Sequence, residues 1–406
     1  MTLPMAWMIL VWTQPPSMIL QGSDTAILGP SPTPISSVVK KPKEEIDLHD
    51  VWNRSFRKNG ERKTDLEGIH PAIVPAAGYT MATGFAAVVS ANLTLASKTG
   101  NNSTILASVA YTEKRQTIIP FQSTFWADKD RYMFISDLRF MNYPSTTFGL
   151  GSHSPISAGD TIDFNYVKLH AAVLRRFARN VYGGIGFYYD KFWNIQETAP
   201  PSGSTSGLHK YGFTPTSISS GPVLRMIYDS RGNPVAPDHG WFISVTGRSN
   251  LRTMGSDTDW HSLTIEARKY FRFPSNSKNV LALWSYNVFT LAGRPPYLML
   301  PSTGWDDFYN TGRGYVQGRY RGRNMAYLEA EYRFRISRDG LFGGVAFGNL
   351  QSFSKNPTRQ LQTVIPGGGI GLRIKLNKYS GANLCVDYGW GMDGQRGISV
   401  NLGEVF

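Results

Sequence analysis

The sequence contains one cysteine, Cys385, so it has neither a disulfide framework nor a cysteine-based zinc site. Charged residues make up only 17% of its 406 residues, whereas they form about a quarter of an ordinary soluble domain. No run of about 18 apolar residues occurs, which excludes a helical membrane protein. Aromatic residues (13%) and the 41 glycines favour strands and tight turns over a helical bundle. Two classes are left: a large soluble β-protein or a transmembrane β-barrel.

The chain is basic, with 42 Lys and Arg against 29 Asp and Glu, and a formal net charge of +13. A nucleic-acid-binding protein would gather its basic residues on one face or arm. Here they are spread along the chain, and the densest run, residues 313–323, is rich in Gly and Tyr. We therefore expect no nucleic-acid partner. A cationic barrel lumen, or contact with outer-membrane lipids and anionic lipopolysaccharide, fits this pattern better.

The first 70 residues differ from the rest. Residues 5–12 form a short apolar run like that of a signal peptide, but no Lys or Arg precedes Lys40 and no A-x-A site follows. We interpret residues 1–21 as a possible, degenerate signal peptide and residues 22–70 as a periplasmic linker, rich in Pro, Ser, Gly and Thr at its start. The linker continues with a solvated charge run, residues 40–45, and then a short amphipathic helix built on Ile46, Val51, Trp52 and Phe56.

From Pro71 to the end, segments of alternating polarity are separated by clusters of turn-forming residues. Between positions 326 and 336 the even positions are apolar or aromatic, while Glu329, Glu331, Arg333 and Arg335 occupy odd ones. A period of two places the apolar side chains on one face of a sheet and the charges on the other. This alternation predicts an all-β fold over residues 71–406.

The connections and the aromatic residues separate a membrane barrel from a soluble sandwich. Tight turns at residues 276–278 and 337–339 contrast with long connections at 198–215 and 293–324, and aromatics gather near strand ends. Outer-membrane barrels have short periplasmic turns, long external loops and aromatic girdles. The sequence thus predicts a transmembrane antiparallel β-barrel of about 16 strands. We expect its first strand at residues 73–79 and its last at 398–406.

Three ordered motifs resemble the outer-membrane assembly and translocation superfamily, the BamA/TamA-like bacterial surface antigen family. The first is a hairpin motif, formed by Asp229, Arg231, Pro234, Pro237 and Gly240. The second lies in the long sixth loop and comprises Arg313, Gly314 and Tyr315, followed by Gly318 and Arg319. The third is the C-terminal half-barrel, which includes Asp387 and a closing-strand signal at Val400, Leu402 and Phe406.

The resemblance implies that loop 6 folds back into the lumen and that Arg313 meets acceptors on the wall. The family places an aspartate opposite this arginine, where the sequence has Asn349. A neutral amide accepts a hydrogen bond but cannot neutralise a guanidinium. We therefore expect Glu329, Glu331 and Asp387, together with Asn349, to be the lumen acceptors. We expect no counterpart of the family's periplasmic POTRA modules in this sequence, because the stretch before Pro71 is too short for one.

The resemblance further implies an integral outer-membrane protein with a periplasmic N-terminus. Its function would be insertion, assembly or translocation of outer-membrane proteins through a lateral seam between the first and last strands. The alternative is a structural partner or a passive pore within a larger envelope complex. Expected partners are other envelope proteins or unfolded outer-membrane proteins.

Chemistry of other kinds has little support in the sequence. The seven histidines are scattered, so we expect no metal and no cofactor. Ser152 stands beside His153 in a Gly- and Ser-rich loop with no third orienting group, so we expect no enzymatic activity.

Overall fold

The structure, a computed structural model, describes residues 45–48, 50, 69–95, 101–199, 206–355, 358–378 and 381–406. The predicted signal peptide and most of the predicted linker lie outside these residues. Leu48 and Asp50 are helical, within the stretch where the sequence predicts a short amphipathic helix. Ile46 is not helical, and Val51, Trp52 and Phe56 lie outside the described residues. No helix in the described ranges is long and apolar enough to cross a membrane.

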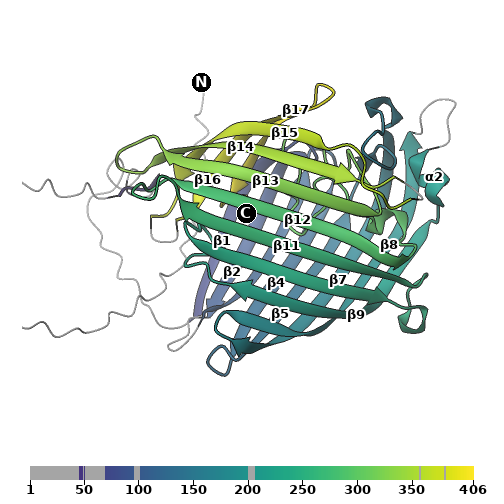
Figure 1. Cartoon of the computed structure of the whole chain (residues 1–406), viewed down its shortest axis with the longest axis horizontal. Helices are drawn as coiled ribbons and strands as arrows, with labels where there is room; N and C mark the ends of the chain where they lie inside the picture. Colours follow the sequence, from purple (N-terminus) through teal and green to yellow (C-terminus); the bar gives the residue numbers. More distant parts are fainter. Residues whose placement is uncertain are drawn as a thin grey trace, which may run out of the picture.

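Strands dominate the described chain (Figure 1). They are β1 (Ile69–Thr80), β2 (Gly84–Leu95), β3 (Ser103–Thr112), β4 (Thr117–Ala127), β5 (Tyr132–Asn142), β6 (Ser145–Thr147), β7 (Asp160–Ala178), β8 (Val181–Ala199), β9 (Thr216–Asp229), β10 (Gly240–Asn250), β11 (Trp260–Arg272), β12 (Val280–Gly293), β13 (Asn324–Arg335), β14 (Phe342–Phe353), β15 (Ile365–Lys375), β16 (Asn383–Gly391) and β17 (Arg396–Leu402). The short helices are η1 (Ile156–Ala158), α2 (Gly207–Tyr211), η2 (Arg252–Met254) and η3 (Tyr297–Met299).

These strands form one closed antiparallel barrel. Apart from β5 and β6, each strand pairs with its neighbours in chain order, and β17 pairs back with β1. The short strand β6 and strand β5 both pair with β7, so they form one interrupted strand of the wall. The 17 elements of the sheet therefore make 16 strands around the barrel, which confirms the predicted architecture.

The alternation seen in the sequence separates the two surfaces of the wall. In β13, Tyr327, Glu329 and Glu331 are 0%, 3% and 0% exposed, whereas Leu328 between them is 54% exposed. Other large apolar side chains are exposed on the same outer surface, among them Phe134, Leu169, Ile185, Leu224 and Ile370. Because the sheet closes, the buried face of each strand points into the barrel. The interior is therefore rich in polar groups and the exterior is apolar.

The two ends of the barrel differ. One end, which we call the turn end, carries the β11–β12, β13–β14 and β15–β16 turns together with residues 45–50. The opposite end, which we call the loop end, carries α2 and the connection between β12 and β13 (Figure 1). The tight turns predicted at 276–278 and 337–339 thus lie at the turn end, and the long connections predicted at 198–215 and 293–324 lie at the loop end, which also carries short turns at 81–83, 113–116 and 392–395.

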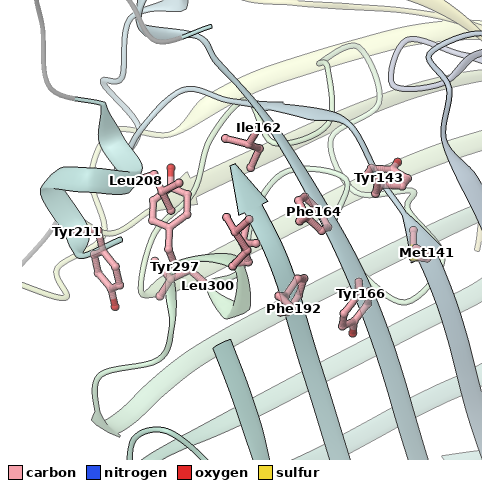
Figure 2. Close-up of a cluster of buried hydrophobic side chains, with 12 residues drawn as sticks. Met141, Tyr143, Ile162, Phe164, Tyr166, Phe192, Leu208, Tyr211, Tyr297 and Leu300 are labelled. Carbon is pink, nitrogen blue, oxygen red and sulfur yellow. The ribbon is translucent and has the colours of Figure 1, made fainter. Parts of the chain in front are cut away.

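Apolar packing fills part of the interior at the loop end (Figure 2). Tyr297, Leu298 and Leu300, which follow β12, pack against side chains from β5, β7, β8 and α2. The partners include Met141, Ile162, Phe164, Tyr166, Phe192, Leu208 and Tyr211. The connection between β12 and β13 is therefore held against the far wall by a hydrophobic core of its own.

The predicted boundaries of the two terminal strands are wrong. Strand β1 begins at Ile69, four residues before the predicted start at residue 73, and β17 ends at Leu402 rather than at Phe406. The backbone leaves the extended conformation at Gly403, whose φ of 86° is accessible to glycine without steric cost. Val405 and Phe406 turn inward and are only 5% and 4% exposed. Val400 and Leu402 lie in β17 as predicted, but Phe406 does not.

Candidate functional site

Arg313, in the connection between β12 and β13, contacts three carboxylates of the barrel wall. Its guanidinium donates to Asp387 at 2.9 Å and also to Glu329 and Glu331. The same group lies 3.6 Å from the centre of the Phe347 ring. The Arg313 side chain is 8% exposed, and the three carboxylates are 0–2% exposed. The structure thus brings together an arginine and three acceptors that the sequence had selected.

Glycines in the wall strands allow the backbone around Arg313 to pack directly against the wall. A Cβ atom at Gly389 would stand 2.7 Å from the Gly314 nitrogen, and one at Gly367 would stand 2.9 Å from the Tyr315 ring. Gly314 itself has a φ of 100°, and a Cβ there would stand 2.6 Å from the carbonyl oxygen of Trp390. Both the backbone angle and the space therefore require glycine at position 314.

Further charges extend the cluster toward the turn end. Arg333 pairs with Glu331 at 2.6 Å and with Glu404 at 3.6 Å, and Arg373 pairs with Asp387 at 2.5 Å and with Glu404 at 3.0 Å. The network therefore holds three arginines and four carboxylates, all largely buried: Arg313, Arg333 and Arg373 with Glu329, Glu331, Asp387 and Glu404. Arg333, Arg373 and Glu404 were not among the predicted site residues, although the alternation already placed Arg333 on the inner face.

Asn349 was predicted to accept a hydrogen bond from Arg313, but in the structure it donates one. Its amide nitrogen donates to the carbonyl oxygen of Arg313 at 3.0 Å, so it binds the backbone and does not accept from the guanidinium. Its Oδ1 atom is buried and has no hydrogen-bond partner among the described residues. An aspartate at this position would add a fifth carboxylate to a network that already has one more carboxylate than arginines. The neutral amide at position 349 is consistent with this balance of charge.

We expect Asn349→Asp to destabilise the barrel more than Asn349→Ala does. Alanine removes one hydrogen bond, which is worth about 1 kcal/mol. Aspartate also removes this donor, and it places a carboxylate oxygen next to the Arg313 carbonyl oxygen, where two acceptors repel each other. In addition it buries an uncompensated charge, which costs about 3 kcal/mol. The heat-modification midpoint on gels should therefore fall in the order wild type, Ala, Asp. An Asp variant at least as stable as the Ala variant would refute this account of the charge balance.

The other motif residues have their own contacts. Tyr315 donates to the Pro366 carbonyl and accepts from the Met392 amide at 2.9 Å. Arg319 pairs with Asp393 at 2.9 Å and donates to the Ser154 carbonyl at 2.8 Å. The Gly318 amide donates to the Thr303 carbonyl at 2.8 Å. These contacts join the β12–β13 connection to loops on two other sides of the loop end.

The hairpin motif lies at the turn end, far along the chain from Arg313. Asp229 ends β9, Gly240 begins β10, and Pro234 and Pro237 stand in the turn between them. Arg231 donates to Asp229 at 2.7 Å and lies 4.5 Å from the ring centre of Phe242. The motif therefore forms a local turn and makes no ion pair with the Arg313 network among the described residues. Tyr270 lies between the two, because it interacts with Arg231 and its ring centre is 5.8 Å from the Arg333 guanidinium.

The inward tail after β17 is a second part of this region that the sequence analysis missed. The Phe406 ring stacks on Trp284 with 5.1 Å between centroids, and its carbonyl accepts from Arg333 at 2.8 Å. Asn310 donates to the Val405 carbonyl at 2.8 Å. The tail, residues 403–406, therefore contacts both the β12–β13 connection and the arginine network. The glycine at position 403 is the sequence signal that could have revealed it.

The seam between β1 and β17 is short. The described residues of the two strands pair at a single position, Tyr79 with Val400. On its other side β1 pairs with β2 at 12 positions, and β17 pairs with β16 at seven. The tail directs the chain away from β1 after Leu402. Most of the β1 edge therefore has no registered partner on the seam side within the described strands.

Comparisons with known proteins identify the fold. No protein-family model matches the sequence, and no curated protein matches it. Among solved structures, BamA from Haemophilus ducreyi lacking POTRA domains 1–3 is similar with a TM-score of 0.56 and 15% identity, over 82% of this chain and 70% of that one. CdiB from Acinetobacter baumannii has a TM-score of 0.53 and 12% identity, over 84% and 66% of the two chains. CdiB from Escherichia coli has a TM-score of 0.54 and 8% identity, over 83% and 67%.

This chain thus spans about two thirds of the length of these three solved structures, from 66% to 70%. At these identities the similarity concerns the fold and not a shared activity. It agrees with the closed antiparallel wall described above. The chain therefore has the barrel fold of the BamA and CdiB structures.

Proposed function

We propose that the chain is an integral outer-membrane barrel that assists the insertion or translocation of other envelope proteins at the seam between β1 and β17, without enzymatic chemistry. In this proposal the turn end and the N-terminus face the periplasm, and the β12–β13 connection remains inside the lumen. The apolar exterior supports the membrane location, because lipid-facing side chains of such barrels form an apolar band.

The observation that supports the proposal most strongly is the single registered pair at the seam, Tyr79 with Val400. A strand edge in a membrane must satisfy its backbone groups, since lipid offers no hydrogen bonds. An edge with few registered bonds is therefore the place where an incoming strand gains most by pairing. Strand β1 combines such an edge on the seam side with a complete ladder to β2 behind it.

A direct test uses purified protein in liposomes and a small outer-membrane barrel diluted from urea as the client. We expect the client to fold faster in these liposomes than in empty ones, because the β1 edge offers a template. Liposomes containing an unrelated closed barrel are the control. Equal client folding rates in all three preparations would contradict the insertion function and leave the structural-partner alternative.

The passive-pore alternative makes a different prediction. An empty barrel of this size leaves an aqueous channel, but here Tyr297, Leu298 and Leu300 pack across the interior. In planar bilayers we expect little conductance from the wild type, and a rise on the order of tenfold when residues 296–322 are replaced by a short Gly-Ser linker. The outward Leu283→Ala variant serves as a control for general damage. Large, steady channels in the wild type would favour the pore.

A further inference from the structure

Three turns at the turn end present four basic side chains to residues 45–50. Lys278 lies in the β11–β12 turn, Arg335 ends β13, Lys375 ends β15, and Lys378 lies in the β15–β16 turn. These turns join successive pairs of neighbouring strands at the same end of the wall, so the antiparallel order of the sheet brings the four cations to one place.

Glu45 occupies the centre of this group. Its carboxylate accepts from Lys278 at 2.8 Å and from Arg335 at 2.6 Å, and it lies 3.3 Å from the Lys375 nitrogen. Partial burial alone would raise the pKa of Glu45, but the hydrogen bonds from Lys278 and Arg335 and the charge of Lys375 lower it to about 2. The expectation that residues 40–45 form a solvated charge run is therefore wrong for Glu45.

The next residues add directional contacts. The Ile46 amide donates to the Asp339 carbonyl at 3.1 Å, and Asp47 accepts from the Lys378 amide at 2.9 Å. Asp50 accepts from the Lys378 side chain at 2.9 Å. Asp47 and Asp50 also accept from one another's backbone amides, at 2.8 and 3.2 Å. This reciprocal capping holds the segment in its bound conformation. The turns therefore contact the three acidic residues of the pattern Glu-x-Asp-x-x-Asp.

The contacts suit an exchangeable ligand better than a permanent anchor. The side chains of Lys278 and Glu45 are 63% and 30% exposed, and those of Lys378 and Asp50 are 19% and 25% exposed. Exposed ion pairs each contribute about 0–1 kcal/mol, and salt screens them. Asp47 is buried, at 4% exposed, and accepts from a backbone amide, but Glu45 and Asp50 are held by partly exposed ion pairs, so another acidic segment can compete for the same cations.

We propose that the four basic side chains form a docking site for an acidic segment of a partner protein with the pattern Glu-x-Asp-x-x-Asp, and that residues 45–50 occupy this site as an intramolecular competitor. The charges are complementary, because Lys278, Arg335 and Lys375 pair with Glu45 and Lys378 pairs with Asp50, while Asp47 accepts from the Lys378 backbone amide. The inference rests on these contacts alone and does not depend on the proposed function.

The test uses the full chain in lipid nanodiscs and a fluorescent synthetic peptide of residues 44–51, with binding followed by anisotropy. The variant E45Q/D47N/D50N weakens the intramolecular competitor. We expect the peptide to bind this variant on the order of tenfold more tightly than the wild type, because a tethered competitor has a high effective concentration. Binding should weaken as salt rises, and a peptide carrying the same three neutralising changes should not bind.

Two further variants in the competitor-weakened background locate the site. K278E/R335E/K375E should abolish peptide binding, whereas K129E, in the exposed β4–β5 turn at the same end, should leave it unchanged. If the charge-reversed variant does not fold, K278Q/K375Q should still reduce the affinity. Equal peptide affinity for wild type and E45Q/D47N/D50N would overturn the proposal, as would an equal loss in K129E. Loss of binding only in nanodiscs containing phosphatidylglycerol would assign the turns to lipid headgroups instead.

Discussion

Arg313→Ala should lower the stability of the barrel by about 3 kcal/mol or more, because it leaves buried carboxylates without their cation. Its guanidinium forms ion pairs with Glu329, Glu331 and Asp387, and the side chains of these three acidic residues are almost fully buried. Without Arg313 the network would hold four carboxylates against two arginines. We expect the heat-modification midpoint to fall and a protease to cut the β12–β13 connection faster.

Arg323→Ala is the matched control for this experiment. Arg323 lies in the same connection, but it donates to the Gly293 carbonyl and forms no ion pair with a carboxylate among the described residues. The control should therefore unfold close to the wild type. Arg313→Lys should recover part of the loss, since lysine restores the charge but not the forked geometry. A wild-type midpoint and digestion pattern for Arg313→Ala would contradict the structural role of this network.

A disulfide across the seam should abolish the proposed insertion activity. Tyr79 and Val400 form the one registered pair between β1 and β17 in the described chain, so Tyr79→Cys with Val400→Cys joins the two strands where they already meet. A cysteine pair at Ala77 and Asn401 would be one residue out of register with this contact. Cys385→Ser provides the background for the experiment. If β1 must part from β17 to receive a client strand, the oxidised protein should be inactive and reduction should restore it.

A disulfide at the same position of β17 on its other side is the control. Val386 pairs with Val400 in the β16–β17 ladder, so Val386→Cys with Val400→Cys links two strands that stay paired in the proposed mechanism. The oxidised control should retain client folding activity. If the oxidised seam variant is as active as the control, the gate is refuted while the barrel fold is unaffected.

The wall of the barrel follows from local sequence. Alternation with a period of two is a property of neighbouring residues, and in residues 326–336 it correctly separates Glu329 and Glu331 from Leu328. The absence of long apolar runs, together with tight turns such as 337–339, gives the class of fold and the 16 strands. The resemblance on Arg313, Gly314 and Tyr315 adds the connection that meets the wall.

The contacts that shape the candidate site depend on closure of the sheet. Arg313 and Asp387 are 74 residues apart in sequence, and Glu45 and Lys375 are 330 apart, so no local period relates them. Asn349 donates to a backbone carbonyl whose position is set by the glycines beneath Arg313. Phe406 leaves its strand because Gly403 permits the bend and Trp284 provides an apolar surface across the barrel. A strand pattern specifies which face a side chain occupies, whereas its partner is chosen only when the wall closes and places distant faces opposite one another.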